Sequence, residues 1–202
     1  MKKTVLMNLI LFSSLLANNV YLNEDEKKFI KQLKNPYPIA HRFDRTYKFI
    51  QNAQSYDKEL KLLKTNYFIN RILPKYDSKH EDEWLNLKEF LITGAGDCED
   101  YAISKYQLLQ ELGIKKSNLF LSVVKVKGAE NFHMVTLYKD IDGLYTLDNL
   151  SWKVIPISER NDLDVEFVFN ENESYIINDF GELKKENINR GEIIKLRETL
   201  SR

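Results

Sequence analysis

The feature that most constrains the fold is a change of hydrophobic period near the middle of the chain. Up to Gly113, apolar residues recur at intervals of three or four, as they do along one face of a helix. From Leu119 onwards they gather in short runs rich in Val, Leu, Tyr and Phe, at the length of strands. Helices followed by antiparallel strands are typical of an α+β domain, which is the class we predict.

The helical half divides into segments with recognisable ends. The sequence predicts helices after Asn23, around 43–50, after Asp57, over 84–91, and from Asp97 to Leu112. The last is the best defined, because Gly113 follows it in the manner of a C-cap. For the helix after Asp57, we expect the side facing the core to hold Leu60, Leu63, Tyr67 and Phe68.

The second half predicts a sheet followed by a closing helix. We expect strands at Leu119–Val126, Phe132–Tyr138, Leu144–Leu147, Val165–Phe169 and Tyr175–Ile177, and a helix over Ile188–Leu200. A turn at 140–143 joins the second and third strands. With seven Gly, four Pro and no linker-like tract, residues 18–202 are expected to form a single domain.

The N-terminus has the pattern of a secretory signal peptide. Lys2 and Lys3 precede an apolar run over 5–16, and the small residue Ala17 suits cleavage. The run is shorter than the roughly 20 residues that a membrane-spanning helix needs. We therefore predict a signal peptide over 1–17, with an uncleaved membrane anchor as the alternative.

Charge excludes one broad class of function. The chain has 30 basic and 30 acidic residues, and the basic ones are spread along its whole length. Such a chain lacks the basic patch that attracts nucleic acid, so we expect no nucleic-acid partner.

Cys98 is the candidate nucleophile. It follows a Gly-rich turn and opens the best helix, where free backbone N–H groups and the helix dipole favour a thiolate. The same N–H groups are suited to stabilising an oxyanion. The alternative is that the chain's one cysteine is a small buried apolar residue.

A base and an orienting carboxylate are available on neighbouring strands. Of three histidines, His41 and His80 lie in polar, charged surroundings, whereas His133 lies inside a predicted strand. If the turn is centred between residues 141 and 142, paired residues sum to 283 and Asp148 is the diagonal neighbour of His133. Diagonal side chains lie about 7–8 Å apart, within reach of a His–Asp contact. A structural histidine and a strand-ending turn at Asp148 remain the alternatives.

Three acidic residues surround the cysteine. Asp97, Glu99 and Asp100 would raise the pKa of a neighbouring thiol. They are expected either to cap the helix or to bind a hard cation such as Ca²⁺ through oxygen. The residues alone favour capping.

The motifs resemble those of the LapG-type bacterial transglutaminase-like cysteine proteases. The nucleophile motif is carried by Gly96–Tyr106, with the sequence GDCEDYAISKY. Further stretches match in order at 133–135, 147–150 and 158–163, and Trp84 with 89–91 resembles the family's lead-in. The Thr-Pro expected after that Trp is missing, so the sequence departs from the family at this stretch.

The resemblance implies a papain-like, transglutaminase-like core with the cysteine helix packed on an antiparallel sheet. It implies Cys98 as nucleophile, His133 as base and Asp148 as orienting group. It also shifts the expectation for Asp97, Glu99 and Asp100 from capping to Ca²⁺ binding.

The expected function follows from the same resemblance. It is a periplasmic, calcium-dependent endopeptidase that cleaves the N-terminal region of a large surface adhesin and so controls biofilm attachment. The implied partner is LapD, an inner-membrane cyclic-di-GMP receptor that sequesters the protease.

Three other functions stay open. The same three residues serve acyl transfer to an amine as in a transglutaminase, and a catalytically idle domain of this fold would bind peptides. A zinc site built from Cys98, His133 and the acids lacks the usual ligand spacing.

Overall fold

The computed structural model describes residues 20–75, 83–178, 181–188 and 190–202. The predicted signal peptide over 1–17 and His80 lie outside these residues. Within them, no helix is both long and apolar enough to cross a membrane.

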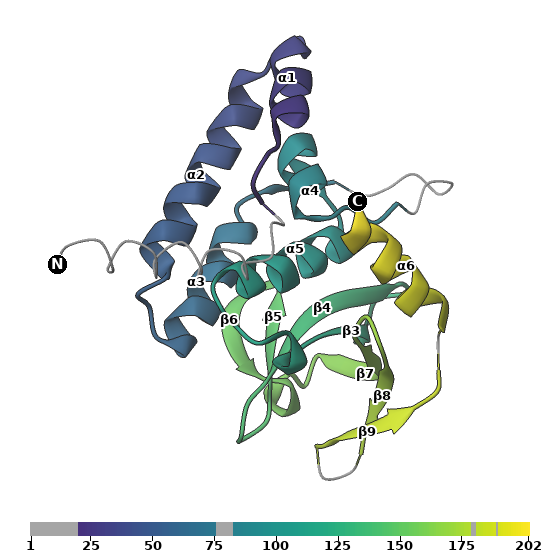
Figure 1. Cartoon of the computed structure of the whole chain (residues 1–202). Helices are drawn as coiled ribbons and strands as arrows, with labels where there is room; N and C mark the ends of the chain where they lie inside the picture. The colour runs from purple at the N-terminus through teal and green to yellow at the C-terminus, as the bar shows by residue number, and fades with distance from the viewer. Residues whose placement is uncertain (1–19, 76–82, 179–180, 189) are drawn as a thin grey trace, which may run out of the picture.

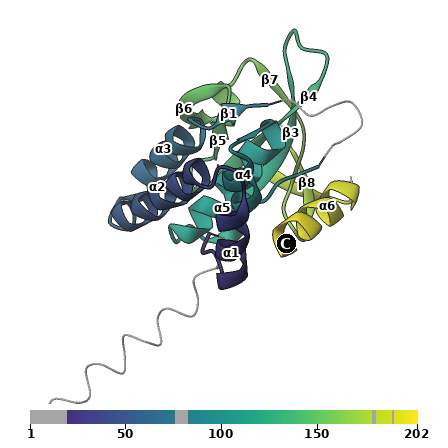
Figure 2. The same cartoon turned by 90° about the horizontal axis from the view of Figure 1, so that it is seen from above.

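The predicted helices are all present. They are α1 (Glu24–Gln32), α2 (Tyr37–Ala53), α3 (Lys58–Ile69), α4 (Leu87–Thr93), α5 (Cys98–Glu111) and α6 (Arg190–Ser201). The first four lie beside and above α5, and the sheet lies below it (Figure 1). Seen from above, α2 and α3 lie on one side of α5 and α6 on the other (Figure 2).

The main sheet has seven strands in the order β6-β5-β4-β3-β7-β8-β9, all antiparallel. The strands are β3 (Leu119–Val126), β4 (Phe132–Lys139), β5 (Leu144–Asp148), β6 (Ser151–Pro156), β7 (Leu163–Phe169), β8 (Ser174–Ile177) and β9 (Leu183–Glu186). The five predicted strands are confirmed, whereas β6 and β9 were not predicted. A separate parallel pair joins β1 (Leu73–Pro74) to β2 (Ala95–Gly96).

The turn at 140–143 sets the register that the sequence predicts. Thr136 pairs with Leu147, Leu137 with Thr146, and Tyr138 with Tyr145, so that paired residues sum to 283. Because side chains alternate between the two faces of a sheet, a shift by one residue would have separated His133 from Asp148.

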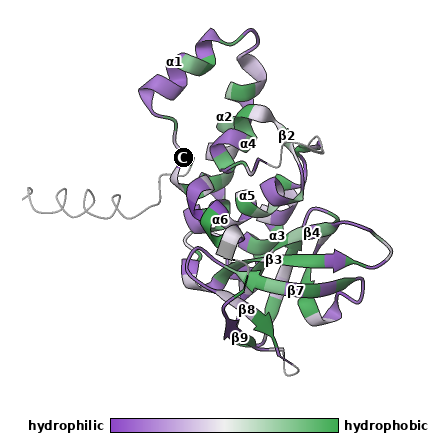
Figure 3. Cartoon of the chain, turned by 90° about the vertical axis from the view of Figure 1, so that its right-hand side faces the viewer, coloured by the Kyte–Doolittle hydropathy of each residue, from purple (hydrophilic) through white to green (hydrophobic). Residues whose placement is uncertain are grey.

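Helix α5 lies at the centre of the molecule. Ala102, Tyr106 and Leu109 pack against strands of the sheet and against α6 in one apolar cluster. Tyr101 and Leu108 belong to a second cluster formed with the N-terminal helices. In Figure 3 the strands β3 and β7 are mostly apolar, whereas α1 is largely hydrophilic. The cysteine helix is thus covered by apolar residues on both sides, and Cys98 lies at its N-terminus.

The predicted apolar side of α3 is wrong. Leu63 and Tyr67 are 43% and 50% exposed, whereas Thr65 and Asn66 are fully buried. Asn66 Nδ2 donates a hydrogen bond of 2.8 Å to the carbonyl of Ser151. The inward face of α3 carries Thr65 and Asn66 beside the buried Leu62 and Ile69. Asn66 faces inward because it hydrogen-bonds to the backbone where β5 turns into β6, which a count of apolar residues does not reveal.

Candidate active site

Cys98 is the first residue of α5, and a short sharp connection places it there. Gly94 ends α4 with φ at 74°, in the left-handed region that favours glycine. A Cβ at Gly94 would lie 2.5 Å from the Arg42 guanidinium carbon, so a larger residue does not fit. Residues 95–96 then pair with β1, and Asp97 is the N-cap of α5.

The thiol of Cys98 is half-buried and faces a carboxylate. Its Sγ donates a hydrogen bond of 3.0 Å to Glu99 Oε2. Burial and the charge of Glu99 raise the pKa of the Cys98 thiol well above its ordinary value, although the Met134 backbone N–H acts in the opposite direction. In this arrangement Cys98 carries its proton, and its sulfur lies beside the backbone of the residue that follows His133.

His133 and Asp148 are joined directly. His133 Nε2 lies 2.8 Å from Asp148 Oδ1, with the two residues 7% and 0% exposed. An ionised carboxylate only accepts hydrogen bonds, so Nε2 carries the hydrogen and Nδ1 is the nitrogen left to take up a proton. The contact matches the predicted strand register, and the tautomer is the one that a general base requires.

Asp148 is held as a charged carboxylate by several partners. Its Oδ1 also accepts from the Leu150 N–H at 2.9 Å, and its Oδ2 accepts from Arg160 Nη2 at 2.8 Å. Burial alone would raise the pKa of Asp148, but the hydrogen bonds from His133, Leu150 and Arg160 outweigh it and hold the pKa well below the ordinary value. Asn70 Nδ2 fixes the Asp148 backbone carbonyl at 2.8 Å.

Arg160 is shared between two acids. Its Nε and Nη2 donate to the two carboxylate oxygens of Asp162 at 2.8 and 2.7 Å, in addition to the contact with Asp148. The Asp162 hydrogen bond raises the pKa of Arg160 further, so that its charge is permanent. Arg160 therefore links the carboxylate that orients His133 to the loop that precedes β7.

Lys105 is a buried cation close to the same group. It lies two turns along α5 from Cys98, is 1% exposed, and has its Nζ 5.9 Å from the centre of the Tyr101 ring. Burial lowers the pKa of Lys105 to about 7, and attraction to Asp148 opposes part of that effect. Lys105 therefore changes its charge near neutral pH.

The three acids beside Cys98 differ in their capacity to bind a cation. Asp100 is 1% exposed, and its two oxygens accept from the backbone N–H groups of Leu85 and Asp97 at 2.8 and 3.2 Å. Capping is therefore the role of Asp100 as placed. Asp97 and Glu99 are partly exposed and supply the oxygen donors that Ca²⁺ prefers. Among the residues that the structure describes, no three His, Cys, Asp or Glu side chains converge as a complete metal site.

The structure thus brings together part of the predicted site. His133 meets Asp148, and Cys98 lies beside Met134. His41 is exposed, as predicted, and stacks on Tyr37. Sequence reasoning assigned no role to Arg160, Asn70 or Lys105. Lys105 and Arg160 lie within the matching stretches 96–106 and 158–163, which were the available signal, but a local pattern does not reveal which distant residue is the partner.

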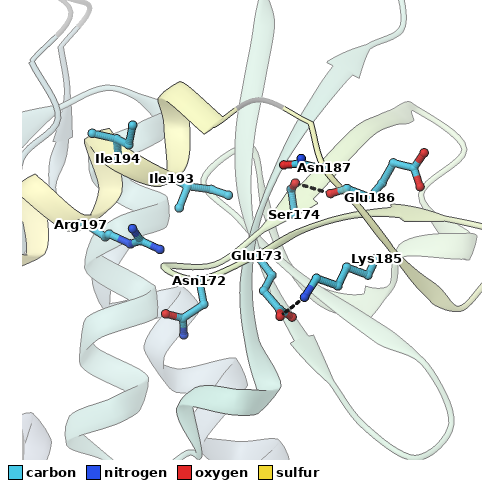
Figure 4. A pocket seen from close by; sticks show the side chains of 9 residues that line it. All are labelled: Asn172, Glu173, Ser174, Lys185, Glu186, Asn187, Ile193, Ile194 and Arg197. Atoms are coloured by element: carbon cyan, nitrogen blue, oxygen red, sulfur yellow. Dashed lines mark hydrogen bonds and ion pairs between the residues drawn. The ribbon is translucent and has the colours of Figure 1, made fainter.

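A cavity elsewhere in the fold is a poor candidate for the reaction site. It has a volume of about 750 Å³ and lies between α6 and the β8–β9 hairpin. Its polar groups satisfy one another, since Lys185 pairs with Glu173 and Ser174 donates to the Glu186 carbonyl (Figure 4). Its described lining contains neither Cys nor His, and its one hydroxyl group, that of Ser174, is bound to a backbone carbonyl rather than to a base.

The chain is similar to proteins of known family and known structure. Residues 41–173 match a family described as bacterial transglutaminase-like cysteine proteinase BTLCP. The calcium-bound structure of Legionella pneumophila LapG is similar with a TM-score of 0.72 and 24% identity, over 85% of this chain and 95% of that one. The EGTA-treated structure of the same protein gives a TM-score of 0.71 and 23% identity, over 87% and 94%. These likenesses confirm the predicted transglutaminase-like fold. No curated protein matches the sequence.

The burial of Lys105 predicts a dependence of stability on pH. Its folded-state pKa of about 7 lies below the ordinary 10.5, so between these values the unfolded chain binds the extra proton. The free energy of unfolding therefore rises with pH across this range, by up to about 1.4 kcal/mol per pH unit from this group. We expect Lys105→Met to remove that rise and to stabilise the fold most below pH 7.

Urea unfolding of both proteins between pH 6 and 9 checks this expectation. Lys64→Met removes an exposed lysine from α3 and serves as the control, with a slope equal to that of the wild type. Parallel pH profiles for the wild type and Lys105→Met would show that Lys105 keeps an ordinary pKa.

Proposed function

Because the chain belongs to the bacterial transglutaminase-like cysteine proteinases, we propose that it is a LapG-like endopeptidase acting through Cys98, His133 and Asp148. The observation that carries this proposal is the buried hydrogen bond between His133 Nε2 and Asp148 Oδ1. It leaves Nδ1 of His133 to act as the base. The Cys98 sulfur lies against the backbone N–H of Met134, the next residue along the chain. A purely structural histidine would not need a carboxylate held by two further donors, the Leu150 N–H and Arg160.

The chemistry follows from these positions. His133 Nδ1 takes the proton of Cys98, and the thiolate attacks the carbonyl carbon of the scissile peptide bond. The backbone N–H groups at the start of α5 stabilise the oxyanion that forms. When the C–N bond breaks, His133 returns the proton to the leaving amine, and a thioester remains on Cys98. Water, deprotonated by His133, then hydrolyses the thioester and frees the thiol.

Asp148 acts by orientation and charge. Held by Arg160 and the Leu150 N–H, it stays ionised and stabilises the imidazolium formed during each proton transfer. A side chain without an acceptor in its place, such as Ala, would also lose the preference for the Nε2–H tautomer. The alternative acceptor, an amine instead of water, uses the same residues up to the thioester.

The substrate and setting are proposed from the sequence motifs. We propose that the chain acts in the periplasm on the N-terminal region of a large surface adhesin, and that a LapD-like receptor sequesters it. Exposed apolar side chains beside the site support a polypeptide substrate. Phe132, next to His133, is 63% exposed, and Leu150 and Trp152 are 61% and 55% exposed.

Substitution of the proposed nucleophile and base tests this function. With an N-terminal fragment of the host's candidate adhesin as substrate, we expect cleavage to fall by on the order of a thousandfold or more in Cys98→Ala and in His133→Gln. His41→Gln changes an exposed histidine and should leave the rate unchanged. Gel analysis with mass spectrometry of the fragments measures the rate, and cleavage by Cys98→Ala at the wild-type rate would refute the assignment.

We also propose that a calcium ion binds beside Cys98 with Asp97 and Glu99 among its ligands. The calcium-bound and EGTA-treated states of LapG support the proposal. When bound, the ion would supply a positive charge beside the thiol. In the structure, Glu99 accepts a hydrogen bond from the Cys98 thiol and raises the pKa of that thiol. A Glu99 carboxylate that binds the cation instead would no longer hold the thiol in its protonated form.

Removal of the cation tests the calcium proposal. We expect a chelator to abolish cleavage and added Ca²⁺ to restore it, because the Cys98 thiol then stays hydrogen-bonded to Glu99. Asp97→Ala and Glu99→Ala should need higher Ca²⁺ concentrations or stay inactive, whereas Glu198→Ala, at an exposed acid of α6, should behave as the wild type does. Full activity in excess chelator would exclude a calcium requirement.

A further inference from the structure

A small basic cavity lies on the N-terminal side of the cysteine turn. It has a volume of about 200 Å³ and is bounded by α2, the end of α3, β1 and the end of α4. Three arginines line it, Arg42 and Arg45 from α2 and Arg71 just after α3, together with apolar groups that include Phe68 and Leu73. Neither the sequence motifs nor the proposed reaction gives these arginines a role.

The arginines are held in place by groups that carry no negative charge. Arg42 donates through Nε and Nη2 to the carbonyls of Leu91 and Ile92 at 2.5 and 2.8 Å. The guanidinium of Arg45 lies 5.8 Å from the centre of the Phe68 ring, and that of Arg71 lies 5.9 Å from the ring of Tyr67. Such contacts fix the position of a guanidinium and leave further N–H groups available.

The cavity therefore has an uncompensated positive charge. Among the residues described as lining it, none is Asp or Glu. Burial alone lowers the pKa of Arg42, with no carboxylate acting against it. A bound anion would supply the counter-charge that the described lining lacks.

The position of the cavity connects it with Cys98. Gly94 forms part of its wall and precedes Cys98 by four residues, a span of at most about 14 Å in an extended chain. Between them, β2 pairs with β1, and Leu73 of β1 is 69% exposed at the edge of the cavity. A polypeptide in extended conformation at Cys98 has only a few residues to cross before it reaches the arginines.

We propose that this cavity binds an acidic side chain of the polypeptide that is cleaved at Cys98, and so contributes to the choice of cleavage site. The inference rests on the proposed function. Arg45 and Arg71 supply planar guanidinium groups that match a carboxylate, and Phe68 and Leu73 supply apolar surface for its methylene groups. Arg42, bonded to the backbone of α4, forms a further wall of the cavity.

Peptide binding to the Cys98→Ala form of residues 18–202 tests the proposal without cleavage. The probes are two fluorescein-labelled, end-blocked peptides, one of alternating Ala and Glu and one of alternating Ala and Gln, measured by fluorescence anisotropy. We expect the Glu peptide to bind at least about tenfold more tightly, and a combined Arg45→Gln and Arg71→Gln change to abolish the difference. Arg42 is left unchanged because its backbone contacts hold α4.

The control removes a positive charge from the same region outside the cavity. Lys64→Gln changes an exposed lysine of α3, and it should keep the full preference for the Glu peptide. Equal binding of the two peptides, or an unchanged preference in the double variant, would overturn the proposal. A third result would also overturn it. Here neither peptide is preferred, inorganic phosphate stabilises the chain more than chloride does at equal ionic strength, and the double variant lacks this stabilisation.

The outcomes separate this inference from the proposed function. An active protease whose double variant binds both peptides as the wild type does refutes only the arginine site. A chain that prefers the Glu peptide through Arg45 and Arg71 but never cleaves a polypeptide keeps the anion site and loses the enzyme assignment.

Discussion

The structure around the site depends on one buried carboxylate. Asp148 is fully buried and charged, which is costly unless every oxygen has partners. Its partners come from distant parts of the chain, namely His133 in β4, Arg160 after β6, and Asn70 after α3 through the backbone. The same contacts that satisfy the charge also fix the imidazole and tie α3 to the sheet. Loss of His133 or Arg160 would leave a buried charge partly unsatisfied, so fold and chemistry are linked at this residue.

The start of α5 shows a second link between stability and chemistry. The acids that surround Cys98 suit a helix N-terminus, and Asp100 accepts hydrogen bonds from the N-cap N–H of Asp97 and from the Leu85 N–H before α4. The cost is a nearby negative charge that keeps the Cys98 thiol protonated. Burial of Lys105 in the same helix is a further cost to stability at neutral pH. Both effects, the raised pKa of Cys98 and the burial of Lys105, arise because the site places ionisable groups in buried positions.

Much of this arrangement could be predicted from the sequence. The turn at 140–143 predicts the register of β4 and β5 that the structure has. That register makes His133 and Asp148 diagonal neighbours. The helix beginning at Cys98 was predictable from Asp97 and Gly113, since caps depend on local chemistry. These are short-range relations, which a single sequence contains.

The remainder depends on contacts between distant segments. Asn66 and Asn70 look like surface residues of α3 until the β5–β6 turn is placed beside them. Arg160 looks like a loop residue until Asp148 is known to need a cation. Strand β6 was missed because its exposed Trp152 and Lys153 hide the alternation that predicts a strand. The basic cavity likewise combines helices α2 and α3 with the turn at Gly94, and no local motif predicts it.

The central claim is that His133, oriented by Asp148, ionises Cys98. The chain contains 1 cysteine, so alkylation by iodoacetamide reports on Cys98 alone. The account predicts that, in the presence of Ca²⁺ at about pH 6, the wild type reacts at least about tenfold faster than His133→Gln, because only the wild type holds a thiolate below the ordinary thiol pKa. Identical rates and identical pH dependence in the two proteins would contradict the account.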